Sequence, residues 1–218
     1  MMNRFFATWK NVVFNPMETF QQLPNKNQIK NGSWFFIKVQ VLMAAVLLLF
    51  FLITLPLRML PYAFQGGSET LIGGFGLFAS ALIMVIAVPF IILISWGFLF
   101  VGAGILHLFV KLFGGKGPYR ETFQAVAYAS APAVFNGIPI IGYFAPIYIV
   151  VLQVIGINKR QKLSVGRSVG VVLLPGAIIL AILMILLIIG LIFLFATAAG
   201  GAMLTGNSVL SGLGGLLN

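Results

Sequence analysis

Apolar residues in this chain occur in long runs, without the alternation that marks amphipathic helices or strands. The longest run without a charged residue extends from Thr70 to Leu106. A water-soluble domain needs no such run, whereas a helix of about 20 apolar residues crosses a hydrocarbon core of about 30 Å. The pattern therefore predicts an all-α, polytopic integral membrane protein built as a bundle of helices.

Five membrane spans are predicted, at residues 39–57, 75–110, 122–136, 140–157 and 168–197. The second is unusually long, because its uncharged run alone measures roughly 55 Å as a helix. We expect one long helix that projects beyond the membrane and is kinked at Pro89, since proline removes a backbone donor. The alternative is a pair of short helices that turn at Pro89.

The third and fourth spans form a short hairpin. Its turn is predicted at residues 136–139, where the sequence reads Asn-Gly-Ile-Pro. Each arm is at the short limit for a span, and Pro132 and Pro146 interrupt the arms. The alternative is a re-entrant hairpin, whose exposed backbone the neighbouring helices would have to cover.

Residues 1–37 form an N-terminal arm. Phe5, Phe6, Trp9 and Val12 share one helical face, which is typical of a helix that lies among lipid headgroups. The alternative is a cytoplasmic helix that packs on the rest of the protein. A second short helix should follow from an Asn15 cap. At the other end, residues 198–218 are expected to form a Gly-rich tail outside the membrane domain at 38–197.

Charge sets the expected orientation. Only 7% of the residues are charged, and 13 Lys and Arg stand against 3 Asp and Glu, for a net charge of +10. The basic residues lie in short segments between apolar runs, which favours anionic lipid over nucleic acid as the partner. Since Lys and Arg concentrate in cytoplasmic loops, the N-terminus should be cytoplasmic and the C-terminus exterior.

Side chains near the ends of the apolar runs are expected to contact lipid headgroups. They are Phe6, Trp9, Lys10, Lys111, Lys116, Arg120, Lys159, Arg160, Lys162 and Arg167.

No catalytic group, cofactor or metal ligand set is predicted. The chain has no cysteine, and His107 is its single histidine. Gly114-Gly115-Lys116-Gly117 follows an apolar helix rather than a strand, so it is expected to be a glycine turn and not a phosphate loop. The three glutamates lie outside the predicted spans, which argues against an ion-coupled transporter. A lipid-modifying enzyme would need a carboxylate partner for His107.

Small residues recur every four positions at Ala125, Ala129 and Ala133, and again at Gly166 and Gly170. This spacing lets helices approach closely. Internal packing is the first interpretation, and a homo-oligomer interface is the second.

Several short motifs follow one another in an order that resembles the Yip family of membrane proteins, in particular its small bacterial-type members. The motifs are Asn15-Pro16-x-Glu18-Thr19-Phe20, Gly115-Lys116-Gly117, Ala127-Tyr128-x-x-x-Pro132, Ile138-Pro139-Ile140-Ile141-Gly142 and Val154-Ile155-Gly156-Ile157. The resemblance implies a five-span fold and a trafficking-like role. It also implies a membrane or small-GTPase-like protein partner, because relatives in eukaryotes bind prenylated Rab GTPases. The partner surface would include Tyr128, Pro132, Asn136, Pro139 and Gly142.

Together these observations predict a non-enzymatic membrane protein that binds lipids or protein partners and organises the bilayer. The alternative is a subunit of a transporter, channel or permease, which would need a polar cavity that reaches the middle of the membrane.

Overall fold

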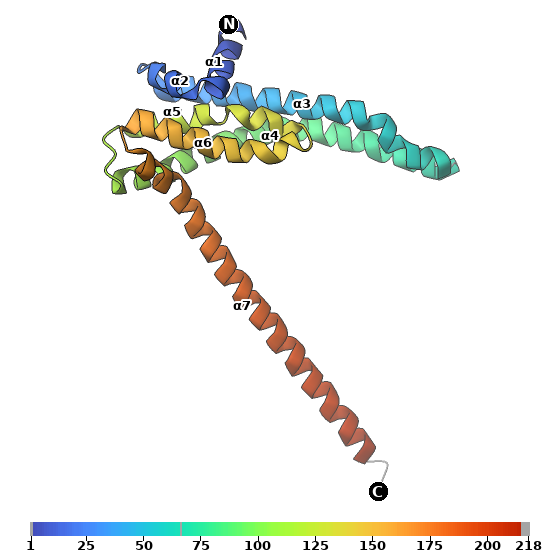
Figure 1. The fold of residues 1–218 in the computed structure, drawn as a ribbon. Helices are drawn as coiled ribbons and strands as arrows, with labels where there is room; N and C mark the ends of the chain where they lie inside the picture. The colour runs from blue at the N-terminus through green and yellow to red at the C-terminus, as the bar shows by residue number, and fades with distance from the viewer. Residues whose placement is uncertain (1, 66, 215–218) are drawn as a thin grey trace. The chain divides into compact units, whose positions relative to one another are not determined.

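The computed structural model describes the backbone of residues 2–65 and 67–214, and the side chains among them except at 2, 63, 65, 67, 69–71 and 198–214. The chain forms two compact units, residues 1–172 and residues 173–218, which are described separately. Every regular element in the described residues is helical (Figure 1). The helices are α1 Met2–Phe14, α2 Pro16–Gln22, α3 Gln28–Gln65, α4 Gly67–Leu112, α5 Tyr119–Ala129, the 3₁₀-helix η1 Ala131–Gly137, α6 Ile141–Gln161 and α7 Val165–Gly214.

The prediction of an all-α membrane protein is confirmed, but the five-span count is not. Among the described residues four helical segments are long and apolar enough to cross a membrane: 28–62, 72–112, 141–161 and 165–197. The predicted third span, 122–136, is divided into α5 and η1 at Ser130. The division has a local cause, because Pro132 has no N–H to donate and the Ser130 hydroxyl bonds back to the Ala127 carbonyl at 2.7 Å.

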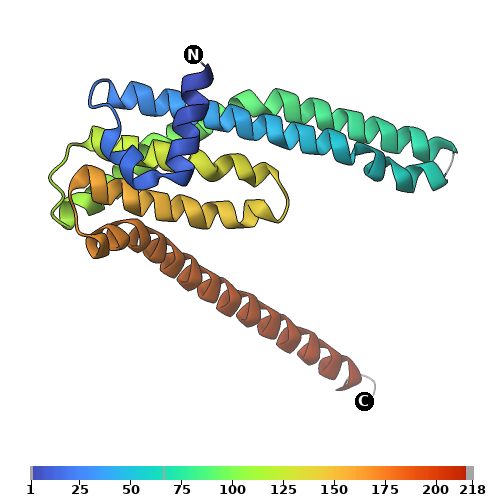
Figure 2. The ribbon, with the colours of Figure 1, turned by 45° about the horizontal axis from the view of Figure 1, so that its top comes forward.

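Two helical hairpins make up the first unit. In one, α3 and α4 run side by side as the longest helices of the unit, and α4 continues through Pro89 as a single helix rather than turning there. In the other, α5 and η1 pair with α6. Figure 2 shows that this second hairpin ends well before the far end of the α3–α4 pair.

The core lies where α5 meets the other helices of the first unit. Phe123, Ala127 and Ile157 are fully buried in one cluster, and Phe20 and Leu152 in a second. Farther along the α3–α4 hairpin the apolar side chains lie open. Leu57 is 67% exposed and Phe75 is 73% exposed. Only a hydrocarbon solvent can cover such a surface without a large free-energy cost.

The second unit, considered by itself, is the rest of α7. Its described side chains include large apolar residues at nearly every position from Ile178 to Phe195, each exposed. A helix that is apolar on all sides is typical of a membrane span, and residues 165–197 are long and apolar enough to cross a membrane. The predicted tail 198–218 lies outside the described side chains, and its backbone is described only as far as Gly214.

Small residues allow the close helix contacts in the core. A Cβ atom at Gly156 of α6 would meet the Phe20 ring at 3.0 Å and the Ala125 methyl at 3.1 Å. Ala125 and Ala129 are fully buried, and Ala133 is 7% exposed. The alanine stripe therefore serves internal packing, while Gly166 has open space around it.

Gly156→Leu should detach the short helix α2 from α6, because the new side chain needs the space that Phe20 occupies. We expect a loss of about 1–3 kcal/mol in stability, measured as a lower midpoint of thermal unfolding of the full chain in detergent. Gly102→Leu is the matched control, since a Cβ at Gly102 meets nothing within 4 Å. An equal effect of both substitutions would contradict the packing described here.

Candidate functional site

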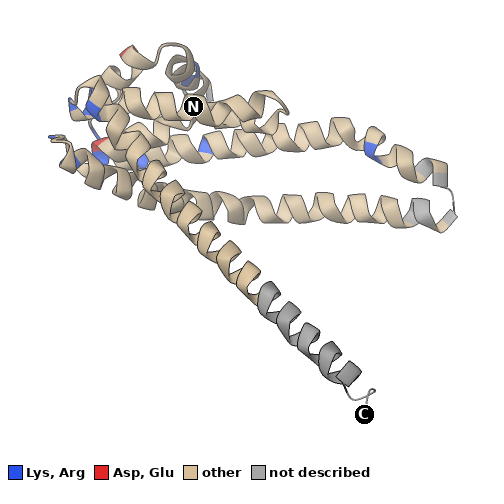
Figure 3. Ribbon diagram, turned by 60° about the horizontal axis from the view of Figure 1, so that its bottom comes forward, with Lys and Arg blue, Asp and Glu red and all other residues tan. Residues whose placement is uncertain are grey.

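Lysine and arginine residues gather at one end of the first unit, which we call the basic end. It comprises the C-terminal ends of α4 and α6 and the N-terminal ends of α5 and α7. Figure 3 shows the Lys and Arg residues, in blue, concentrated there. Arg58 lies apart, near the other end of α3. The exposed cations of the basic end are Lys111, Lys116, Arg120, Lys162 and Arg167, and Lys159 is half-buried.

The glycine loop at 114–117 closes α4 at the basic end. The Lys111 ammonium donates to the Gly115 carbonyl at 3.3 Å and to the Gly117 carbonyl at 2.9 Å. Gly114 has φ +84°, and a Cβ at Gly115 would come within 2.3 Å of Val110. Gly114 needs glycine for its backbone conformation, and Gly115 needs it for space. The glycines of this loop are therefore explained by the way α4 ends.

Arg160 does not lie at the exposed surface where a headgroup contact was expected. It is 8% exposed, and its guanidinium donates to the Leu23 carbonyl at 3.3 Å and to Asn25 Oδ1 at 3.1 Å. Leu23 ends α2, whose last carbonyls lack helical partners. A cation there satisfies one carbonyl and complements the negative end of the helix dipole.

The N-terminal arm is held against the core in the same way. The Trp9 indole donates to the Ala131 carbonyl at 2.8 Å, at the break between α5 and η1. The Tyr148 hydroxyl donates to the Val13 carbonyl in the last turn of α1. The indole N–H of half-buried Trp9 therefore contacts protein, and the headgroup contact expected of Trp9 stays a prediction. Phe6, at 45% exposed, and Lys10 point away from the core.

His107 belongs to a polar network between α4, α5 and α6. Its Nδ1 lies 2.9 Å from Thr122 Oγ1, which also accepts a hydrogen bond of 2.9 Å from the Gln161 amide. Gln161 donates in addition to the Pro118 carbonyl at 3.3 Å. The described residues contain no group of three or more His, Cys, Asp or Glu side chains that could hold a metal ion. The network joins three helices and offers no acid beside His107 among its partners.

Arg160→Met should loosen the arm, since it removes the charged donor that caps α2. We expect a loss of about 2 kcal/mol, within the range for hydrogen bonds to charged groups, and faster trypsin cleavage after Lys26 in the full chain. Lys162→Met is the control, because Lys162 is exposed and its loss should change stability by less than about 0.5 kcal/mol. If the two variants behave alike, Arg160 does not hold the arm.

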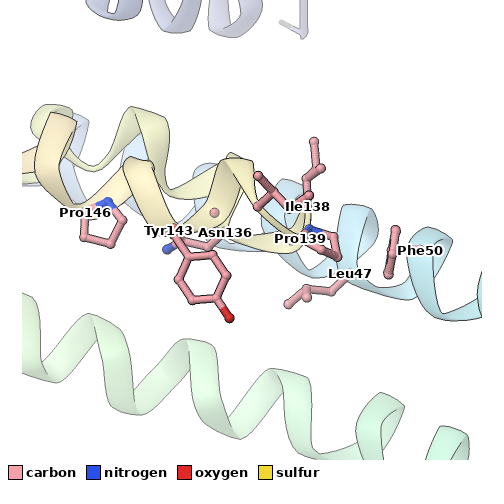
Figure 4. A pocket seen from close by; sticks show the side chains of 10 residues that line it. Leu47, Phe50, Asn136, Ile138, Pro139, Tyr143 and Pro146 are labelled. Atoms are coloured by element: carbon pink, nitrogen blue, oxygen red, sulfur yellow. The ribbon is translucent and has the colours of Figure 1, made fainter.

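A cavity of about 490 Å³ lies at the tip of the α5–η1–α6 hairpin, which we call the tip pocket. It is lined by Leu47, Phe50, Asn136, Gly137, Ile138, Pro139, Ile140, Gly142, Tyr143 and Pro146 (Figure 4). Most of these side chains are apolar, and Tyr143 is 82% exposed. The pocket can accept an apolar group with at most a few hydrogen bonds.

The structure brings only part of the predicted motif surface together. Asn136, Pro139 and Gly142 line the tip pocket. Tyr128 lies elsewhere, 6% exposed and stacked on Phe35 with 4.3 Å between the ring centroids, and Pro132 is fully buried. These two residues lie in the core and not at the surface of the first unit, so the exposed part of the predicted partner surface is Asn136, Pro139 and Gly142.

Close backbone contacts shape the tip pocket. A Cβ at Gly142 would lie 3.1 Å from the Asn136 carbonyl oxygen, and a Cβ at Gly137 would lie 2.8 Å from the Val46 side chain of α3. The hairpin tip is thus held tightly against α3.

Ile140 in the tip has a strained backbone, which the sequence did not predict. Its φ is +70° and its ψ is −59°, and the Ile141 N–H donates to the Pro139 carbonyl at 2.9 Å across it. This is a γ-turn, a rare conformation for a β-branched residue, and such strain is concentrated at functional sites. The one sequence signal was the Asn-Gly-Ile-Pro turn just before it.

Ile140→Gly should stabilise the protein by about 1 kcal/mol, because glycine adopts positive φ without the clash of a Cβ atom. Ile140 is 74% exposed, so little packing is lost. Ile140→Ala is the control, since it shortens the side chain but keeps the Cβ, and it should give no such gain. The thermal unfolding midpoint of each full chain in detergent distinguishes them; a gain for alanine equal to that for glycine would refute the strain.

Comparison with known proteins gives one match. The family model described as the Yip1 domain matches residues 10–187. This range begins in α1 and ends in α7, so it includes the arm, both hairpins and the basic end. No curated protein matches, and no solved structure matches.

Proposed function

The chain belongs to the Yip1 family of membrane proteins, and from that membership we propose that it is a non-enzymatic protein that binds anionic lipid through its basic end and thereby organises the bilayer around it. The observation that carries the proposal is the concentration of exposed cations at one end of the first unit. Each Lys or Arg near an anionic leaflet contributes about 1 kcal/mol of attraction.

The proposal includes an orientation. The basic end faces the cytoplasm, because cytoplasmic loops carry the excess of Lys and Arg. The N-terminus then lies in the cytoplasm and the C-terminus outside, in a bacterial cytoplasmic membrane. The arm carries an exposed cation, Lys10, and an exposed aromatic ring, Phe6, which are typical of a helix that lies among headgroups.

A transporter or channel subunit has weaker support. It would need a polar cavity deep in the membrane, whereas the two cores are filled mainly by Val, Phe, Ala and Leu side chains. The tip pocket is likewise mostly apolar. An apolar pocket with a strained wall fits the binding of a lipid chain or a partner helix better than the passage of a hydrophilic substrate.

The test is to neutralise the basic end and measure lipid enrichment. The full chain is extracted in mild detergent, and the ratio of anionic to zwitterionic lipid that co-purifies is compared with the ratio in the membrane. We expect enrichment for the wild type, and a fall of about fivefold or more for the combined variant Lys116→Gln, Arg120→Gln, Lys159→Gln and Lys162→Gln.

Arg58→Gln is the control, because it removes an exposed cation from the other end of α3. It should leave the enrichment unchanged. The proposal is wrong if the ratio of anionic to zwitterionic lipid that co-purifies with the wild type equals the ratio in the membrane.

A further inference from the structure

A further feature of the first unit is a groove between α3 and α4. A cavity of about 520 Å³ is lined by Ile29, Lys30, Ser33, Trp34, Ile37, Trp96 and Phe100. A neighbouring cavity of about 290 Å³ shares Ile37 and Trp96 with it and continues past Pro89 and Ile92. A third, of about 180 Å³, shares Ile92 and reaches Ala45 and Leu48. The three form one continuous groove.

The groove changes character along its length. Lys30, Ser33 and Trp34 occupy one end, and the remainder is lined by apolar side chains. On α3 the lining residues recur every three or four positions, so they share one helical face. The apolar part extends from Ile37 to Leu48, about 16 Å along the helix axis. This equals the depth of one leaflet, which is half of a hydrocarbon core of about 30 Å.

Three observations identify the occupant of the polar end. Lys30 is an exposed cation, and no acidic residue lines the cavity. Trp34 and Trp96 both line it, and tryptophan marks the membrane–water interface. The Trp96 indole N–H is buried and has no hydrogen-bond acceptor among the described residues. Buried donors rarely stay unpaired, so we expect an acceptor from outside the chain at this position.

We propose that the α3–α4 groove binds one anionic glycerophospholipid. Its phosphate lies at Lys30 and Ser33, an ester oxygen accepts the Trp96 N–H, and one acyl chain extends along Ile37 and Ile92 toward Ala45. The proposal deepens the lipid-binding part of the proposed function and rests on it only in requiring an anionic leaflet at the level of Trp34 and Trp96. The Lys30 contact is separate from the cations of the basic end.

The test is lipid binding to the delipidated full chain in detergent, followed by native mass spectrometry. Phosphatidylglycerol is the anionic probe, phosphatidylcholine the zwitterionic one, and inorganic phosphate the free-anion arm. We expect one phosphatidylglycerol per chain, bound more tightly than phosphatidylcholine and not displaced by phosphate. Lys30→Gln should weaken binding about fivefold, and Trp96→Phe should also weaken it.

Ala45→Phe should abolish binding of the lipid, because the new ring fills the end of the groove that holds the acyl chain. Leu49→Phe is its control and should leave lipid binding unchanged, since Leu49 lines none of the three cavities. Lys26→Gln is the charge control, since Lys26 is an exposed cation in the segment before α3 that does not line the cavity. The combined basic-end variant should keep the single tight lipid while losing the excess of loosely bound anionic lipid. That outcome separates the groove from the proposed function.

The groove proposal fails if phosphatidylcholine binds as tightly as phosphatidylglycerol, if phosphate displaces the lipid, or if Lys30→Gln and Ala45→Phe both retain it like the wild type. It also fails if the combined basic-end variant loses the tight lipid and Lys30→Gln does not. Thermal unfolding of each variant shows whether it is folded before its binding is compared.

Discussion

Hydrocarbon accepts no hydrogen bond and solvates no charge, and the position of nearly every polar group in this protein follows from that constraint. The chain satisfies its backbone by forming helices, and most of its cations lie near helix ends or in the loops between helices. The middle of α4 and the described length of α7 beyond Val172 carry apolar side chains on all faces. The basic end is a direct consequence, since Lys and Arg have no other place to reach water.

The same constraint accounts for the polar contacts that hold the N-terminal arm. Helices α1 and α2 are short, and their last carbonyls have no helical partners. Side chains from α6 fill this need, with Tyr148 bonding to Val13 and Arg160 to Leu23. In the other direction, the Trp9 indole of the arm donates to a carbonyl at the break between α5 and η1. The arm and the broken hairpin thus complete each other's hydrogen bonds, and the family match includes both.

Three features would then act together at the membrane. The basic end attracts anionic lipid without choosing a single molecule, whereas the α3–α4 groove has the shape and the unpaired donor to hold one. The tip pocket lies at the opposite end of the short hairpin and is held by close contacts and a strained Ile140. A protein of this kind would organise a bilayer by binding, with surfaces at different depths.

The sequence by itself determined the solvent, the helical class and the separation of charged from apolar segments. It did so because these depend on composition and run length, which need no knowledge of contacts. It also indicated that Pro89 would lie inside a long helix and that residues 136–139 would turn. The family resemblance grouped Asn136, Pro139 and Gly142 on one predicted surface, and these three residues line one pocket.

Only the tertiary structure decided which of these residues face outward. Tyr128 and Pro132 are close to Asn136 in sequence, yet they point into the core, because α5 is buried along nearly its whole length. Arg160 and Lys162 are both basic and lie two positions apart, but one caps α2 and the other is exposed. The groove joins Lys30 to Trp96, residues that lie far apart in the chain. Burial and contacts between residues far apart in the chain depend on how the helices pack. The pattern of apolar residues predicts which face of a helix is apolar, but it does not predict which helix packs against that face.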